Sequence, residues 1–172
     1  MTTMNCYFSA ESLFSHLALV CAAGFTGASF YINFAEQPAR QQLDDRNFLK
    51  QWKASFSQAL KMQSSLALAS SVLGMLTTWT TQDKRWVLGA TLMFANMPFT
   101  LVMIMPTNRK LMATKETEAT PATRALLDSW GKLQAVRTVL SAMACVAYIW
   151  ALGPVVKVPV ELTTTKTTTT ES

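Results

Sequence analysis

The sequence predicts an all-α protein, a four-helix transmembrane bundle. Half of its 172 residues are hydrophobic and only 15% are charged, whereas a soluble domain carries about 25% charged residues. Four apolar stretches of about 20 residues recur along the chain, which is the length that crosses about 30 Å of hydrocarbon as a helix. We therefore expect the lipid bilayer to be the main partner of the chain.

The predicted spans are separated by two polar loops and one short turn. They cover residues 13–34, 59–79, 86–105 and 133–152. We expect residues 1–152 to form one transmembrane domain, and the threonine-rich residues 153–172 to form a disordered tail. Two interpretations of the tail stay open, a plain solvated segment and, on a lumenal side, a site of O-glycosylation.

The first loop contains a second helical pattern. Apolar residues recur there at near-helical spacing among charged ones: Leu43, Phe48, Leu49, Trp52 and Phe56. This pattern is typical of an amphipathic helix that lies in the plane of the membrane interface. We therefore predict a short interfacial helix in this loop.

Lysine and arginine residues are concentrated in two loops, residues 35–58 and 106–132. Cytosolic loops of membrane proteins carry an excess of these residues, so both loops are predicted to be cytosolic and both termini lumenal or extracellular. The formal net charge is +5, but the basic residues form no stripe interleaved with aromatic ones. Nucleic-acid binding is therefore not indicated.

Few residues could hold a metal or form a redox centre. The three cysteines, Cys6, Cys21 and Cys145, include no CxxC pair, and His16 is the only histidine. A single histidine excludes a bis-histidine haem and a multi-histidine metal site. We predict no metal site.

Small residues recur four positions apart in the first two predicted helices, a spacing that lets helices approach closely in lipid. The pairs are Ala23 with Gly27, Gly24 with Ala28, Ala67 with Ser71, and Ser70 with Gly74. Pro98 should kink the third helix, and Asn96 is placed to hydrogen-bond a group that the proline frees or a neighbouring helix.

The predicted topology brings polar residues of all four helices to the cytosolic end. Trp130, Gln134 and Arg137 follow an i, i+4, i+7 spacing and share one helix face. Arg137 lies more than a turn inside the last helix, where a charge costs about 3 kcal/mol. Two interpretations stay open. In the structural one, Arg137 reaches the interface or pairs with Glu36; in the functional one, it presents its guanidinium to an anionic oxygen in a pocket.

Several segments together resemble a known family. They are GASFYINFAEQPAR (27–40), Trp52, MPFTLVMIMPTNRKL (97–111) and WGKLQAVRTVLS (130–141). In combination with four spans, they resemble the anthrone oxygenase-like small integral membrane proteins, a family largely of unknown function. The resemblance extends from about Gly24 to Ser141.

The resemblance implies an oxidoreductase, a cofactor-free oxygenase that converts an anthrone, or a similar lipophilic polycyclic or quinone-like substrate, with O₂. It assigns catalytic roles to Glu36 as the base and to Arg137 and Asn108 as groups that stabilise an enolate oxygen. The substrate-binding candidates are Tyr31, Trp130, Gln134 and Asn96. Relatives often carry histidine or asparagine in place of Gln134, and glutamine cannot act as a base at neutral pH.

Other functions stay open at this point. The chain could be a non-enzymatic accessory subunit or interaction protein of a membrane complex, or assemble as a homo-oligomer; a channel or carrier is the weakest alternative because the spans offer little polar pathway. An enzyme should have a cavity that opens to the cytosolic leaflet beside Tyr31, Asn108, Trp130 and Arg137. In an accessory protein these groups should satisfy one another.

Overall fold

The computed structural model describes residues 10–154, and this part of the chain is all-α with four long helices and no strand. The predicted fold class is confirmed to this extent. The helices run α1 Ala10–Tyr31, η1 Ile32–Glu36, α2 Gln37–Gln41, α3 Asp45–Thr81, α4 Arg85–Phe99, η2 Thr100–Ile104, α5 Met105–Ala113, η3 Glu116–Glu118 and α6 Pro121–Leu152. Most of the predicted tail, residues 155–172, lies outside the described residues.

Two of the long helices contain a π-helical segment. η1 joins α1 to α2 with helical backbone angles at both ends, and η2 joins α4 to α5 in the same way. Residues 12–41 and 85–113 therefore each form one continuous helix. Single-turn π segments inside α-helices occur frequently at functional sites.

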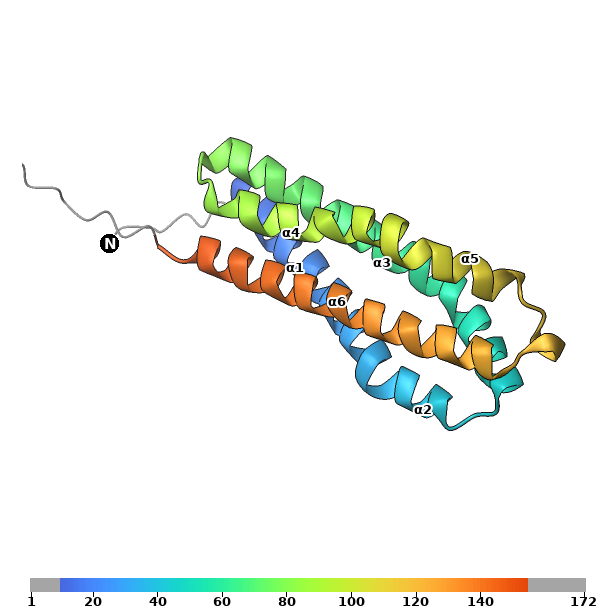
Figure 1. Ribbon diagram of the computed structural model, residues 1–172. Coiled ribbons are helices and arrows are strands. Elements are labelled where there is room, and N and C mark those ends of the chain that lie inside the picture. The colour runs from blue at the N-terminus through green and yellow to red at the C-terminus, as the bar shows by residue number, and fades with distance from the viewer. Residues whose placement is uncertain (1–9, 155–172) are drawn as a thin grey trace, which may run out of the picture.

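The four long helices form a bundle whose neighbours run antiparallel (Figure 1). α1 packs against α3, α3 against α4, α4 against α6, and α6 against α1, which closes the ring. The start of α1 and the end of α6 lie beside the α3–α4 turn. We call this the Asp83 end, and the opposite one the α2–α5 end.

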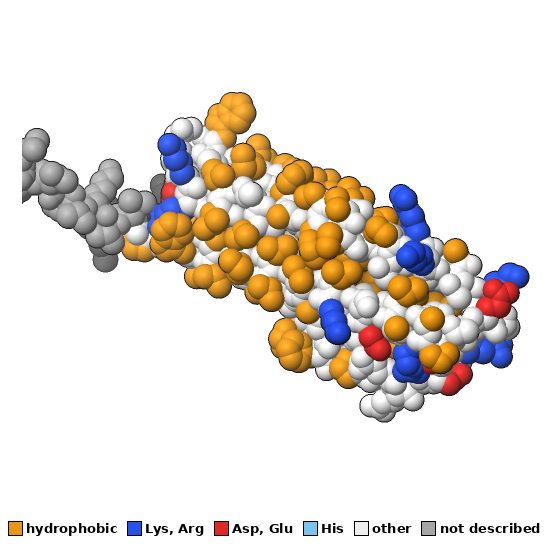
Figure 2. All heavy atoms as spheres, in the orientation of Figure 1, with side chains coloured by type: hydrophobic (Ala, Val, Ile, Leu, Met, Phe, Trp, Pro, Cys, Tyr) orange, Lys and Arg blue, Asp and Glu red, His pale blue; other side chains and the backbone are white. Residues whose placement is uncertain are grey.

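Three helices are long and apolar enough to cross a membrane: residues 12–41, 85–113 and 121–152. The surface agrees with this, because apolar side chains cover the middle of the bundle and charged ones gather towards its two ends (Figure 2). The chain is therefore a multi-pass integral membrane protein. α3, which contains the second predicted span (residues 59–79), is 37 residues long but is not among the three apolar helices.

The predicted interfacial helix in the first loop is wrong. From Asp45 onward these residues are the first turns of α3, and Phe48, Leu49 and Trp52 are fully buried. They pack with Ile104, Leu111, Leu127 and Trp130. The amphipathic pattern was real, but its apolar face meets the other helices of the bundle instead of lipid.

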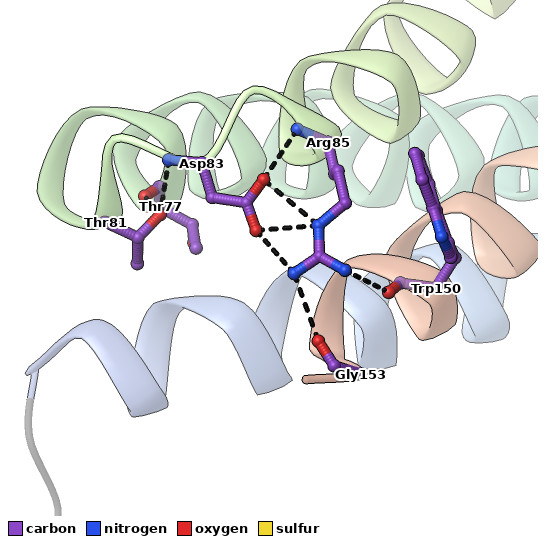
Figure 3. A network of polar contacts seen from close by, with 6 residues as sticks. All are labelled: Thr77, Thr81, Asp83, Arg85, Trp150 and Gly153. Atoms are coloured by element: carbon purple, nitrogen blue, oxygen red, sulfur yellow. Dashed lines mark hydrogen bonds and ion pairs between the residues drawn. The ribbon is translucent and has the colours of Figure 1, made fainter. Parts of the chain in front are cut away.

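Arg85 ties the α3–α4 turn to the end of α6 (Figure 3). Its Nε lies 2.9 Å from the Asp83 carboxylate, and its two terminal nitrogens donate to the carbonyls of Trp150 and Gly153, each at 3.0 Å. The last carbonyls of a helix lack intrahelical partners, so this arginine caps α6 from another helix.

Gln82 ends α3 in the left-handed conformation, with φ of 56°.

Candidate functional site

A layer of buried polar side chains crosses the bundle between two apolar clusters. The cluster at the Asp83 end includes Phe25, Met93 and Tyr148, and the cluster at the α2–α5 end includes Trp52 and Trp130. The layer between them contains Ser29, Gln63, Asn96, Thr100, Gln134, Arg137 and Ser141, all less than a tenth exposed. Buried polar groups in lipid are expensive and usually mark function.

Arg137 occupies the centre of this layer. Its side chain is only 6% exposed, so it lies inside the bundle and not on its surface. Its Nη1 donates to Gln134 Oε1 at 3.0 Å, and its guanidinium carbon lies 5.0 Å from the centre of the Phe25 ring. The hydrogen bond and the cation–π contact both stabilise the charge, but neither neutralises it.

Gln134 connects Arg137 to two other helices. Its Nε2 lies 3.5 Å from Ser29 Oγ on α1, and Gln63 Nε2 of α3 donates to the same hydroxyl at 3.2 Å. Gln134 and Ser29 are fully buried. This chain of contacts orients the Gln134 oxygen towards the guanidinium and so fixes the position of Arg137.

A small cavity of about 20 Å³ adjoins this layer; we call it the inner cavity. Its polar and aromatic lining comprises Glu36, Arg40, Trp52, Ser55, Phe56, Gln63, Thr100, Asn108, Trp130 and Arg137. η1 contributes Ile32 and Glu36, and η2 contributes Thr100 and Ile104. Both π-helical segments therefore border the cavity, which has room for one or two water-sized groups.

Five residues around the inner cavity carry buried polar atoms that have no hydrogen-bond partner within residues 10–154. The atoms are Arg40 Nε, Trp52 Nε1, Asn108 Nδ2 and Oδ1, Trp130 Nε1 and Arg137 Nε. Leaving such an atom unpaired costs about 1–3 kcal/mol, and most buried polar groups are paired. Five of the six atoms are N–H donors, so the cavity suits an oxygen that accepts hydrogen bonds, above all an anionic one.

The charges around the inner cavity do not cancel. The Glu36 carboxylate pairs with Arg40, whose Nη2 also donates to Ser55 Oγ. Arg137 has no ion pair in the described part of the chain, which leaves one net positive charge among these three residues. The alternative in which Glu36 pairs with Arg137 is therefore wrong.

A second space, which we call the lateral crevice, lies between α3 and the helix formed by α4, η2 and α5. It has a volume of about 220 Å³, and Leu60, Thr100 and Arg137 line both it and the inner cavity. Asn96 lies in its wall, and Leu101, which is 63% exposed, lies at its rim. Arg137 is therefore one of three residues that border both spaces.

The structure brings together most of the site residues that the sequence analysis singled out. Glu36, Asn108, Trp130 and Arg137 line one cavity, Gln134 bonds Arg137 from behind it, and Asn96 lines the adjoining crevice. Tyr31 lines neither space and is 63% exposed on the surface of the bundle. Within residues 10–154, no group of three or more histidine, cysteine or acidic residues lies close enough to hold a metal.

Several lining residues of the inner cavity had no predicted site role, and two of them, Arg40 and Trp52, carry unpaired buried N–H groups. Arg40 falls in the predicted cytosolic loop 35–58, but it is 1% exposed, and its position four residues after Glu36 is a usable signal of pairing. Trp52 packs edge-on against Trp130, with ring centres 5.7 Å apart. Its place among the segments of the family resemblance was the available signal.

Comparison with protein families found a match to the family described as anthrone oxygenase, over residues 52–147. The matched region covers more than half of the chain and includes Trp52, Asn96, Asn108, Trp130, Gln134 and Arg137. Glu36 and Arg40 lie before it. Comparison with curated proteins and with solved structures returned no match.

Proposed function

The chain belongs to the anthrone oxygenase family, and on this basis we propose that it is a membrane-embedded, cofactor-free oxygenase of a lipophilic polycyclic ketone of the anthrone type. The observation that carries the proposal is the inner cavity, where unpaired N–H donors and an uncompensated Arg137 surround a space of about 20 Å³. Preorganised donors of this kind stabilise negative charge that develops on oxygen in a transition state.

In the proposed reaction, Glu36 takes a proton from the methylene carbon of the anthrone, which leaves an enolate. The enolate oxygen accepts hydrogen bonds from Arg137 and Asn108, and the net positive charge of the cavity favours this ionised form. Within residues 10–154, Glu36 is the only acidic residue that lines the inner cavity. Its position there, next to Arg40, is the reason for choosing it as the base.

Oxygen then reacts at the deprotonated carbon. The enolate passes one electron to O₂, and the two radicals combine into a peroxide anion at that carbon. The peroxide regains the proton from Glu36, and loss of water forms the second carbonyl. One anthrone and one O₂ thus give one anthraquinone and one water, with the methylene carbon oxidised to a ketone and O₂ reduced.

We also propose that α3 is the fourth membrane span, with both termini lumenal or extracellular. The exposed residues between Met62 and Trp79 are almost all apolar; the exception is Ser65. The buried face of α3 carries the polar residues instead, including Gln63 and Ser70. A helix that turns its apolar side outward and its polar side inward suits lipid, and its buried serines and threonines lower its mean hydropathy.

A non-enzymatic accessory or interaction role is the second candidate. The size of the inner cavity favours it, because small-molecule sites usually measure about 300–1,000 Å³ and a tricyclic ring cannot fit into about 20 Å³. An accessory role would leave the unpaired donors without a purpose, however. The lateral crevice also offers space beside Arg137 that the inner cavity lacks.

Oxygen uptake by the purified protein tests the proposed function. Anthrone should support O₂ consumption and formation of anthraquinone in equal amounts, and Arg137→Gln should lower the rate about 100-fold or more. Arg85→Gln, which removes an arginine at the opposite end, is the matched control and should keep the rate. A folded, monodisperse wild-type protein that consumes no O₂ would favour the accessory role.

A further inference from the structure

We propose that the lateral crevice takes a neutral lipophilic phenol directly from the bilayer and holds its rings against Arg137. The ligand class is a flat aromatic ketone that carries a hydroxyl group. This inference adds a binding site and a ligand class to the proposed function. It rests on that function only for the identity of the ring system. Binding at the crevice requires neither O₂ nor turnover.

The first support is that the crevice lies directly against the inner cavity and shares lining residues with it. Leu60, Thr100 and Arg137 form a shared wall between the two spaces. A ring system in the crevice, with about 220 Å³ available, could therefore place one oxygen next to Arg137. The inner cavity would then receive only small groups, which matches its volume of about 20 Å³.

The second support is the rim of the crevice, which faces lipid. Leu101 is mostly exposed, and Ser64, Met97 and Met105 are half-buried beside it. Methionine side chains are flexible and adapt to the shape of a ligand. A molecule dissolved in the bilayer can thus reach the crevice between α3 and η2 without passing through water.

The third support is Asn96, which needs a donor from the ligand. Its side chain is 1% exposed, and its Nδ2 donates to the carbonyls of Leu92 at 3.1 Å and Met93 at 3.4 Å. Its Oδ1 is buried and has no partner within the described residues. The crevice thus offers an acceptor in its wall and donors at its inner end, the pattern that a hydroxyaryl ketone complements.

A larger apolar groove on the same pair of helices lacks these features. It lies nearer the Asp83 end, has a volume of about 590 Å³, and is lined by residues such as Val72, Trp79 and Phe94. None of its lining residues carries a buried polar atom without a partner. We interpret this groove as a surface furrow for acyl chains.

Binding measurements in lipid nanodiscs test the inference, with 2-hydroxyanthraquinone and its methyl ether as probes. Asn96→Leu should weaken binding of the hydroxyl probe about 10-fold and leave the ether almost unchanged. Ser64→Trp should fill the crevice and weaken both probes 10-fold or more, with the smaller Ser64→Leu as a second variant. Ser65→Trp is the matched control, because Ser65 is the next residue and does not line the crevice.

The outcomes separate this inference from the proposed function. Binding that requires Ser64 and Asn96, without O₂ uptake, would support the crevice and refute the oxygenase. Normal O₂ uptake by folded Ser64→Trp and Ser64→Leu would refute the crevice and leave the oxygenase intact. Equal binding of the two probes by wild type and Asn96→Leu would also refute it.

Discussion

The Glu36 carboxylate pairs with Arg40, four residues further along the same helix, although Arg137 lines the same cavity. Arg40 is almost fully buried, and it would be costly to bury without its partner. The Glu36 carboxylate therefore compensates the charge of Arg40, which allows this arginine to be buried inside the bundle. The charge of Arg137 is left over, and in the proposed function this surplus favours an anionic oxygen in the cavity.

The Glu36–Arg40 pair should be important for stability. Arg40→Met leaves a partly buried carboxylate unpaired, so we expect a loss of about 2 kcal/mol in the free energy of unfolding. The double variant Glu36→Gln, Arg40→Met should recover part of that loss. Thermal unfolding of wild type, the two single variants and the double variant would measure this as a double-mutant cycle. Arg109→Met removes an exposed arginine and serves as control. A change below about 0.5 kcal/mol for Arg40→Met would contradict a buried ion pair.

The membrane crossing of α3 can be tested at its two ends. Gln42 and Gln82 are exposed and flank the helix. In a variant without the three natural cysteines, Gln42→Cys should react with an impermeant maleimide only from the cytosolic side, and Gln82→Cys only from the other side. Labelling of both positions from one side would show that α3 does not span the membrane.

Much of the fold could be predicted because helix length and apolar composition are local properties. The apolar stretches 13–34, 86–105 and 133–152 each lie within a helix that can cross a membrane. The direction in which a side chain points could not be predicted. Tyr31 and Ile32 are neighbours at one depth, yet only Ile32 lines the inner cavity, because direction depends on helix rotation at η1.

The prediction of an interfacial helix in the first loop is wrong for a related reason, because it too depends on where side chains point. An amphipathic pattern around Trp52 shows that one face is apolar, but it does not reveal whether that face meets lipid or protein. The contact between Trp52 and Trp130 joins residues far apart in the sequence, and no local pattern encodes it. Arg137 could be recognised because a charge inside an apolar stretch is conspicuous in the sequence itself.

Tyr148 sets a steric requirement on two helices. Its hydroxyl donates to the Ser70 carbonyl at 2.9 Å, and a Cβ atom at Gly74 or Gly89 would overlap its side chain. Gly89→Ala should therefore destabilise the protein by about 1–3 kcal/mol. At Gly27, no atom of another helix in the described part of the chain lies within 4 Å of the Cβ position, so Gly27→Ala should be neutral or slightly stabilising. Thermal unfolding in detergent would distinguish them, and equal melting temperatures would contradict this packing.

Asp83 should make the Asp83 end sensitive to acid. Hydrogen bonds from Arg85 hold the pKa of the Asp83 carboxyl below its ordinary value. Such a group contributes stability above its unfolded pKa of about 3.9, and that stability is lost as pH falls through the lower folded pKa. Between about pH 6 and pH 3, the melting temperature of wild type should therefore fall further than that of Asp83→Asn.

Arg85→Gln is the companion variant for this test, because it removes the donor and keeps the carboxyl group. Its melting temperature should show the same weakened dependence on pH as that of Asp83→Asn. Identical pH profiles for wild type and both variants would show that the contact drawn in Figure 3 contributes no pH-dependent stability.

The stabilisation of an oxyanion by Arg137 can be measured without turnover, by titrating 2-hydroxyanthraquinone bound to the protein and following the visible absorption of its phenolate. The phenolate of this probe shares its charge by conjugation with a ketone oxygen, which the crevice places next to Arg137. The donors and the net positive charge there predict that the bound phenol ionises at a pH at least one unit lower in wild type than in Arg137→Gln, equivalent to about 1.4 kcal/mol. Arg85→Gln should match wild type. The same phenol pKa in wild type and a folded Arg137→Gln protein would contradict an oxyanion site at Arg137.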